Sequence, residues 1–484
     1  MNKKQKMNKT LKNIADNWKL EAKLEDTTKY FFHSSEVDSI VKRDKCYIIG
    51  RKGSGKSAIC EYLIKRKEHN VFSTKLSFKN FPFNELYNLD NQKYTPPNQY
   101  ITLWKYLIYS NVCKLMTANE NIEQSIRTEL SKLYPKNDVK SLARTISNWT
   151  SAEFGATVLG NGGTFKFSKE INSNPIPWIE KVNILEDIIL NYCDGSEYYI
   201  VFDELDEDYR QISNEEDSQQ YVFLLTSLFK AVQDIKSTFL ASNKNVKPVI
   251  FLRDDIYTLI KDSDKNKWRD FKIDVVWNEK KLKDLLAFRI SKDFDENTQP
   301  LSFQSAWDKI FYREAIGFGN KQEKKIHSFD FIARSTHLRP RDFIQYLQGC
   351  AEETYNKGFN FIREGNIKFV DRAFSNYLRD EIVDEVFPVL PEIEEYIQIF
   401  ANIRKWNFSL QEFTNEYNKY LKAGTIKEKN IDFVLDTLYN FSVIGNQHKH
   451  RKEIFYFKYM HTNMTFNRTE NIVIHRGLFK ALQL

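Results

Sequence analysis

Residues 50–57 read Gly50-Arg51-Lys52-Gly53-Ser54-Gly55-Lys56-Ser57 and fit the pattern G-x-x-x-x-G-K-[ST]. The residues before it, 46–49, form a short apolar run that is typical of a buried strand, and residues 58–64 carry apolar side chains at helical spacing. A strand, a glycine-rich loop and a helix in this order predict a cradle for phosphate. Backbone N–H groups and the N-terminus of a helix both favour a bound anion.

The residue types in the loop indicate separate tasks. Glycines allow positive φ and a close approach of the backbone to a ligand. Lys56 is predicted to reach the β- and γ-phosphates, and the hydroxyl of Ser57 is predicted to ligate Mg²⁺. The alternative is a chance glycine-rich turn between a strand and a helix. The residues predicted to contact the nucleotide are Gly50, Gly53, Ser54, Gly55, Lys56, Ser57 and Ala58.

A second motif lies at residues 198–204, where Tyr-Tyr-Ile-Val-Phe runs straight into Asp203 and Glu204. The apolar run predicts a central parallel strand that is buried on both faces. Its carboxylates would emerge at the edge of the sheet where phosphate ligands bind. Asp203 is predicted to hold the Mg²⁺ shell, and Glu204 is predicted to act as the general base toward water. Many strands end in acidic turns, so the motif gains weight only beside the glycine-rich loop.

The chain has 484 residues and is too long for one core. The segment between Ser57 and Asp203 is much longer than one helix and one strand need, so we expect an insertion at about residues 80–180. Within it we predict helices over 102–116 and 122–133 and a β-hairpin over 154–167. The predicted domains are an N-terminal helical segment at 1–36, a nucleotide-binding core at 37–280, a helical lid at 281–380 and a winged-helix-like domain at 381–484.

Near the N-terminus we predict an amphipathic helix within residues 14–36, followed by the aromatic cluster at 30–32. This segment would either cover an adenine or pack on the core. From Leu282 the pattern predicts only helices.

The C-terminal region, residues 381–484, has a different pattern of predicted elements. Helices are predicted over 391–404, 409–421 and 428–441, with Ser409 as an N-cap. Two apolar runs then flank the basic loop 448–452, and a closing helix is predicted over 474–482. Three helices and a basic-tipped hairpin indicate a winged helix. The wing would grip DNA phosphates, or the domain would serve only as a packing module. The helix over 428–441 includes Asp432 and Asp436, which phosphates would repel.

Composition narrows the classes of partner. The net charge of +7 permits a nucleic-acid partner without requiring one. Five scattered cysteines with no C-x-x-C pair predict reduced thiols and a cytoplasmic protein. No apolar run is long enough for a transmembrane helix, so no membrane partner is expected.

Four motifs, G-R-K-G-S-G-K-S, I-V-F-D-E-L-D, F-L-R-D-D and L-R-P-R-D, together with a terminal winged helix, resemble P-loop ATPases of the AAA+ and STAND-like group. The chain is similar in particular to bacterial ATPases with a D-E-L-D box, some of which belong to phage-defence operons. The resemblance implies an α/β fold: a parallel sheet of the additional-strand class of P-loop NTPases, with a helical insertion, a lid and a C-terminal winged helix. It also implies ATP and Mg²⁺ as cofactors and nucleotide-driven switching or remodelling, with a homo-oligomer or an effector protein as partner.

The resemblance also suggests roles for arginines. Arg253, at the end of the strand over 248–252, stands where the additional-strand class places a sensor for the γ-phosphate. Arg341 follows Pro340 at the predicted start of a helix and is expected to be a second sensor, with Arg339 as the alternative. We expect Arg253 and Arg341 to approach the γ-phosphate from opposite sides. Lys267 and Arg269 are candidates for an arginine finger.

The sequence lacks the motifs that mark other classes of P-loop protein. The chain has no Q-x-x-G-R-x-x-R of a second helicase lobe, no L-S-G-G-Q of transporter-type ATPases and no N-K-x-D or T-K-x-D for guanine. The remaining alternative is a non-catalytic scaffold that holds a nucleotide, or a DNA-binding switch with little turnover.

Overall fold

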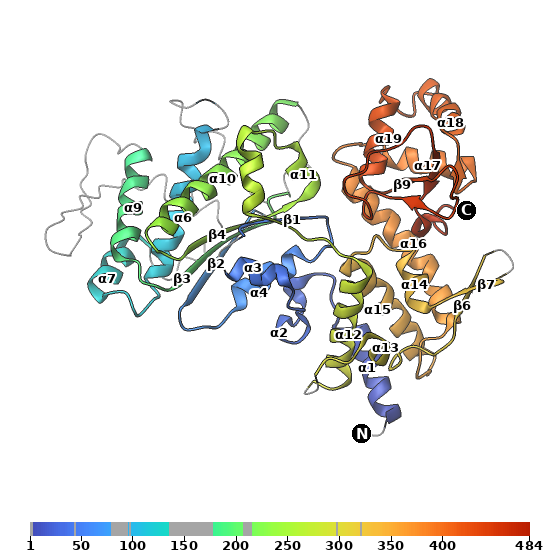
Figure 1. Ribbon diagram of the computed structural model, residues 1–484, viewed down its shortest axis with the longest axis horizontal. Coiled ribbons are helices and arrows are strands. Elements are labelled where there is room, and N and C mark those ends of the chain that lie inside the picture. The colour runs from blue at the N-terminus through green and yellow to red at the C-terminus, as the bar shows by residue number, and fades with distance from the viewer. Residues whose placement is uncertain are drawn as a thin grey trace. The chain divides into compact units, whose positions relative to one another are not determined.

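The structure is a computed structural model that describes residues 3–42, 45–78, 95, 98–134, 178–206, 215–296, 299–319 and 322–484. The chain divides into two compact units, which are described separately (Figure 1). The first unit comprises Met1–Phe32, Lys52–Gly55 and Val276–Leu484, and the second comprises His33–Arg51 and Lys56–Val275. The predicted division into four domains stays a prediction.

The second unit is built on a parallel sheet with the strand order β2-β3-β4-β1-β5. Its strands are β1 (Tyr47–Gly50), β2 (Val71–Ser77), β3 (Glu197–Asp203), β4 (Val246–Arg253) and β5 (Lys272–Asp274). β4 pairs with both β1 and β3, so an extra strand separates the strand before the glycine-rich loop from the strand that ends at Asp203. This arrangement confirms the predicted α/β fold of the additional-strand class.

Helices cover both faces of this sheet (Figure 1). On one face lie α6 (Ile101–Met116), α9 (Trp178–Tyr192) and α10 (Glu215–Ala241), which share a core with Tyr198, Ile200 and Phe202 of β3. On the other face lie α3 (Ser35–Val41) and α4 (Lys56–Lys65). The side chains of β3 alternate because successive residues of a strand point to opposite faces.

Shorter elements complete the second unit. They are η2 (Asn98–Tyr100), α7 (Gln124–Leu133), α11 (Asp254–Leu259) and η4 (Ser263–Asp270). The helices predicted over 102–116 and 122–133 are confirmed by α6 and α7. The predicted hairpin over 154–167, and most of the predicted insertion, lie outside the described residues.

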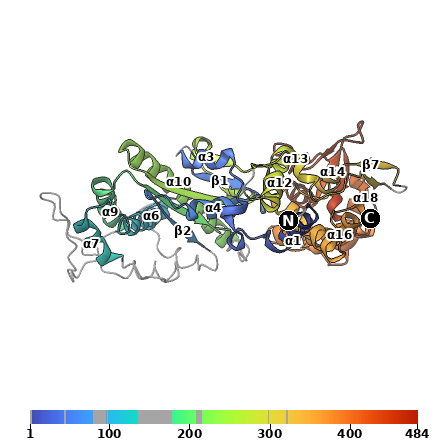
Figure 2. The same cartoon turned by 90° about the horizontal axis from the view of Figure 1, so that it is seen from below.

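The N-terminal helix begins earlier than the sequence pattern indicated. α1 (Lys3–Asn17) ends where the helix predicted within 14–36 was expected to begin, so that prediction is wrong. Leu11, Ile14 and Trp18 are buried in one core with residues of α12 (Glu279–Phe294) and α15 (Pro340–Asn356). α1 lies beside α12 (Figure 2). The indole of Trp18 donates to Asp293, and the chain turns there into η1 (Ala22–Leu24) and α2 (Thr27–Tyr30). The hydroxyl of Tyr30 also donates to Asp293, so this aromatic residue packs in the core.

The lid is mainly helical. Its helices are α12 (Glu279–Phe294), α13 (Phe303–Trp307), α14 (Ser328–Ala333), α15 (Pro340–Asn356) and α16 (Glu364–Val386). The expectation of helices alone is wrong in one place, because β6 (Ile316–Phe318) and β7 (Lys324–Ile326) form an antiparallel pair. These three-residue strands are too short to leave a clear period of two in the sequence.

The C-terminal region is a winged helix, as predicted. Its helices are α17 (Ile393–Ile403), α18 (Leu410–Lys422) and α19 (Ile431–Asn440), and its sheet has the order β10-β9-β11-β8. The strands are β8 (Asn407–Phe408), β9 (Ile444–Gln447), β10 (Phe455–Tyr456) and β11 (Asn471–Ile474). Ser409 caps α18 in a capping box with Glu412, as its position indicated. The predicted closing helix is wrong: β11 occupies its start, and only the short η5 (Arg476–Leu478) follows.

No described helix combines the length and the apolar character that crossing a bilayer requires. All five cysteines are buried and free.

η5 packs closely against the lid at Gly477. A Cβ atom added there would overlap the carbonyl oxygen of Ser335 and the side chain of Leu378 on α16. We expect Gly477→Ala to lower the free energy of unfolding by about 1–3 kcal/mol, because backbone and core must move apart. Gly365→Ala on the exposed surface of α16 is the control. A Cβ atom there meets nothing within 4 Å, so we expect a change of no more than about 1 kcal/mol, in the stabilising direction. Calorimetric melting of both variants tests this, and equal melting temperatures would contradict it.

Candidate functional site

The flanks of the glycine-rich loop belong to the second unit. β1 ends at Gly50, and α4 begins at Lys56. The Lys56 ammonium donates to the carbonyl oxygens of Gly50 at 2.7 Å and Arg51 at 3.0 Å, so it folds back over the loop. Ser57 is exposed in the first turn of α4, and Ala58 is half-buried beside it. Exposed backbone donors at this helix N-terminus suit an anion.

The environment of Lys56 favours a bound anion. Burial lowers the pKa of its ammonium, and the carboxylate of Asp206 opposes that shift without cancelling it. A cation that is partly stripped of water gains from a neighbouring phosphate, because the phosphate replaces lost hydration with a charge of opposite sign.

The middle of the loop, Lys52–Gly55, belongs to the first unit. Gly53 and Gly55 have φ of +77° and +91°, a region that glycine adopts without strain. No atom lies within 4 Å of the place where a Cβ of Gly55 would stand. The indole of Trp277 donates to the carbonyl oxygen of Ser54 at 2.7 Å. The buried Oγ of Ser54 has no hydrogen-bond partner among the described residues.

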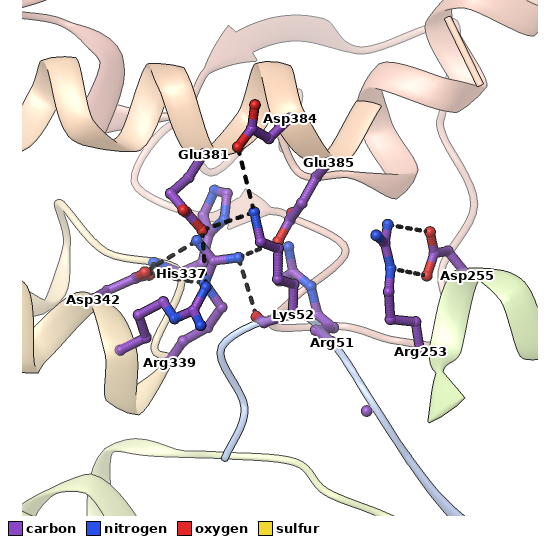
Figure 3. A network of polar contacts seen from close by, with 12 residues as sticks. Arg51, Lys52, Arg253, Asp255, His337, Arg339, Asp342, Glu381, Asp384 and Glu385 are labelled. Carbon is purple, nitrogen blue, oxygen red and sulfur yellow. Dashed lines mark hydrogen bonds and ion pairs between the residues drawn. The ribbon is translucent and has the colours of Figure 1, made fainter. Parts of the chain in front are cut away.

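Arg339 holds this part of the loop to the lid (Figure 3). Its buried guanidinium donates to Asp342 of α15 at 3.1 Å, to Glu385 of α16 at 2.7 Å and to the carbonyl oxygen of Lys52 at 3.2 Å. Burial lowers the pKa of Arg339, but the two carboxylates raise it well above its ordinary value. Arg339 was the alternative candidate for the second sensor, and its side chain already binds two carboxylates and the loop. Its role as a sensor stays a prediction.

Arg341 lies beside the same loop. Its backbone N–H donates to the carbonyl oxygen of Gly53 at 3.4 Å, and a Cβ on Gly53 would stand 3.1 Å from the Cβ of Arg341. Its half-buried guanidinium reaches Glu381 of α16 at 3.5 Å, and Lys52 binds the same carboxylate at 3.2 Å. The sequence prediction that Arg341 lies near the loop agrees with this geometry, whereas its contact with a γ-phosphate stays a prediction.

The acidic motif ends β3 in the second unit. Asp203 closes the strand, and Glu204 follows with φ of +61°, a conformation that costs a non-glycine residue about 1–3 kcal/mol. The hydroxyl of Ser77, at the end of β2, donates to the carboxylate of Glu204. A strained residue with a fixed carboxylate is typical of a functional position.

Lys75 is the partner of Asp203 that sequence reasoning missed. Its ammonium lies 2.7 Å from Oδ2 of Asp203 and 3.3 Å from Oε1 of Glu61 on α4. Burial is the largest single influence on the pKa of Lys75 and lowers it, but Asp203, Cys60 and Glu204 together raise the pKa above its ordinary value, so the lysine stays charged. The only signal in the sequence was the alternation of β2, which places residues 75 and 77 on one face of that strand.

Arg253 ends β4 next to Gly50 of β1, with which it is in register. Its buried guanidinium forms a two-point ion pair with Asp255, at 3.0 and 2.6 Å (Figure 3), and Asp206 lies 3.7 Å away. Its place at the strand end agrees with the sensor prediction, while contact with a γ-phosphate stays a prediction.

Lys267 and Arg269 lie exposed on η4, where Lys267 pairs with Asp264 at 2.7 Å. Their role as an arginine finger also stays a prediction.

The donors fit a nucleotide with Mg²⁺. Ser57 offers a hydroxyl at the start of α4, and Asp203 offers a carboxylate at the end of β3. Among the described residues no group of three or more histidine, cysteine, aspartate or glutamate side chains could hold a metal by itself. An Mg²⁺ ion would thus take its remaining ligands from phosphate and water, which is how it is commonly bound.

Two comparisons of the sequence with known proteins match different lengths of the chain. The FunZ-associated C-terminal helical domain family matches residues 280–383, from α12 to α16. A transposon gamma-delta protein of 80.3 kDa from Escherichia coli (strain K12) is 19% identical over 495 residues, which is 94% of this chain and 64% of that protein. The chain therefore spans less than two thirds of the length of this relative.

Solved structures show similarity over most of the chain at 10% identity. The ORC2 protein of Aeropyrum pernix in ADPNP–ADP complexes has a TM-score of 0.42, with 92% of this chain and 89% of that chain covered. Cdc6p from Pyrobaculum aerophilum has a TM-score of 0.30 with the same coverage. Drosophila ORC bound to DNA has a TM-score of 0.26, with 93% and 84% covered.

The loop network predicts different outcomes for two neighbouring arginines. We expect Arg339→Ala to lower the free energy of unfolding by about 3–5 kcal/mol, because Asp342 and Glu385 would remain as buried carboxylates without their cation. Arg341→Ala is the matched control and should cost less than about 1 kcal/mol, since its ion pair is long and half-exposed. Chemical denaturation of both variants measures the difference. A loss of unfolding free energy in Arg339→Ala as small as that in Arg341→Ala would contradict the conclusion that Arg339 holds the loop to α15 and α16.

Proposed function

We propose that the chain binds and hydrolyses ATP and acts as a nucleotide-driven switch or remodeller. The observation that carries this proposal is the Lys56 ammonium folded over the carbonyl groups of the glycine-rich loop, at the N-terminus of α4. Loop N–H groups and Lys56 would bind the β- and γ-phosphates. Mg²⁺, held through Ser57 and Asp203, would neutralise phosphate charge when bound.

Glu204 is the proposed general base. It would accept a proton from the attacking water, and the hydroxyl of Ser77 would hold its carboxylate in one orientation. Arg253 and Arg341 are the proposed sensors of the γ-phosphate. Their present partners, Asp255 and Glu381, would compete with the phosphate for each guanidinium.

The switch is proposed to run through the first unit. Lys52 of the loop is held by Glu381 of α16 and by Arg339, and Arg339 is in turn held by Glu385 of α16. α16 also binds the winged-helix region, because Asp371 accepts from Arg476 at 3.0 Å. A nucleotide that moved the loop would therefore act on a helix that the C-terminal domain contacts.

The partner of such a switch would be a second copy of the chain or an effector protein. A role in phage defence rests on the resemblance of the D-E-L-D box to that group of ATPases. The rival function is a scaffold that holds ATP or ADP without turnover, and multiple-turnover hydrolysis separates the two.

Two substitutions separate binding from turnover. We expect Lys56→Ala to abolish or severely weaken ATP binding, because the cation on the β- and γ-phosphates is lost. Glu204→Gln should keep ATP binding and reduce turnover by about 100-fold or more, since it removes the general base. Asp206→Asn is the control for the choice of carboxylate. Equilibrium binding and phosphate release measure the effects. Wild-type affinity in Lys56→Ala, or wild-type turnover in Glu204→Gln, would contradict the assignments.

A second candidate function is sequence-tolerant DNA binding by the winged helix. Lys449, Arg451 and Lys452 of the wing are exposed, and no ion pair involves them in the described part of the chain. The two acids of α19 that the sequence analysis counted against DNA, Asp432 and Asp436, both pair with Arg468, at 2.6 and 3.1 Å. Their repulsion of phosphate is thereby reduced. A packing role remains the alternative.

The wing hypothesis predicts a steep salt dependence. We expect the triple change of Lys449, Arg451 and Lys452 to Ser to reduce the slope of log affinity against log salt by about two to three units, one for each lost phosphate contact. Fluorescence titrations with duplex DNA of two unrelated sequences measure the slope. An unchanged slope, or no affinity at low salt, would assign the domain to protein packing.

A further inference from the structure

An ammonium group stands between the two elements that carry the proposed Mg²⁺ ligands. Lys75 projects from β2 and contacts Asp203 of β3 at 2.7 Å and Glu61 of α4 at 3.3 Å. The three side chains are 14%, 6% and 11% exposed. Glu61 lies one helical turn after Ser57, so both residues share a face of α4. The lysine thus bridges the strand of Asp203 and the helix of Ser57.

This arrangement opposes the binding of a second cation. A magnesium ion in the shell of Asp203 would lie within several ångströms of the Lys75 ammonium, and like charges at such distances in a poorly hydrated setting repel strongly. If Lys75 kept its contact with Asp203, the carboxylate would have to serve two cations. Glu61 already accepts from the same ammonium at 3.3 Å, so it can keep the ammonium when Asp203 binds the metal.

We propose that Lys75 is a positioning residue whose ammonium is shared by Asp203 and Glu61 in the metal-free protein and leaves Asp203 for Glu61 alone when Mg²⁺ binds with nucleotide. The ammonium keeps Asp203 oriented and electrically paired until the metal arrives. It also sets a threshold for the metal, because Mg²⁺ must displace a resident cation. This inference rests on the proposed nucleotide-binding function.

The two acceptors distinguish this role from a permanent structural ion pair. A lysine that only joined β2 to β3 would need Asp203 alone. Here a carboxylate on a third element, α4, stands near the same ammonium, and it belongs to the helix whose first turn is proposed to bind phosphate and metal. Movement of the ammonium toward Glu61 would therefore follow ligand binding at the start of that helix.

The test measures how Mg²⁺ affects nucleotide binding, with no need for turnover. Binding of fluorescent ADP to each protein is first measured in EDTA. Mg²⁺ is then added, and the Mg²⁺ concentration that gives half of its maximal effect on ADP binding is determined. Melting temperatures of the metal-free proteins are measured in parallel. The variants are Lys75→Met and Glu61→Gln, with Lys67→Met as the matched control at an exposed lysine for which no ion pair is recorded in the described part of the chain.

The half-maximal Mg²⁺ concentration should change in opposite directions in Lys75→Met and Glu61→Gln. In Lys75→Met the half-maximal Mg²⁺ concentration should fall about tenfold, because a repelling cation is removed and Asp203 is released. The metal-free protein should melt at a lower temperature, since the buried carboxylate of Asp203 loses its counterion and Glu61 keeps only Lys65, at 3.6 Å. In Glu61→Gln the half-maximal concentration should rise, because the second acceptor of the displaced ammonium has lost its negative charge.

The outcomes separate this inference from the proposed function. No binding of ADP or ATP to the wild-type protein would overturn both. Normal nucleotide binding, with the same half-maximal Mg²⁺ concentration in Lys75→Met, Glu61→Gln and the Lys67→Met control, would overturn the inference alone and leave Lys75 as a structural ion pair. Should Lys75→Met fail to fold, Glu61→Gln and the conservative Lys75→Arg still decide. A higher half-maximal Mg²⁺ concentration in Glu61→Gln together with a near-wild-type concentration in Lys75→Arg supports the proposal, and any other pattern overturns it.

Discussion

The buried guanidinium of Arg339 is the interaction on which the geometry of the candidate site most depends. A cation that is removed from water must be paired, and an unpaired one costs several kcal/mol. Arg339 finds its acceptors on α15, on α16 and at the carbonyl oxygen of Lys52 in the loop. The same charge that requires the two helices to stay together therefore also fixes the backbone of the glycine-rich loop.

A second constraint acts at the end of β3. Asp203 is almost wholly buried, and Glu204 is held in a left-handed conformation. Both carboxylates take their partners from β2, where Lys75 and Ser77 lie two residues apart on one face. β2 is thus more than an outer strand of the sheet, because it supplies the charge and the hydroxyl that hold the acidic motif.

The two constraints describe how the proposed nucleotide switch would act. The loop contacts α16 through Lys52 and Arg339, and α16 contacts the winged-helix region through Asp371 and Arg476. The close fit of Gly477 between Ser335 and Leu378 leaves little room for independent movement of η5. A change in the loop is therefore expected to be passed on by packed, charged and poorly deformable groups, rather than absorbed by a flexible linker.

The sequence alone determined the local elements: the strand, loop and helix around Lys56, the buried strand that ends at Asp203 and Glu204, and the capped helices of the winged helix. Periodicity, glycine positions and capping residues are local signals, and they act over a few residues. The tertiary structure decided which side chains meet. Ser77 and Glu204 are 127 residues apart in the chain, and Lys52 and Arg339 are 287 apart. Such contacts depend on the strand order and on helix packing, which no local period encodes. For the same reason Lys75 became visible as the partner of Asp203 only after β2 was found beside β3.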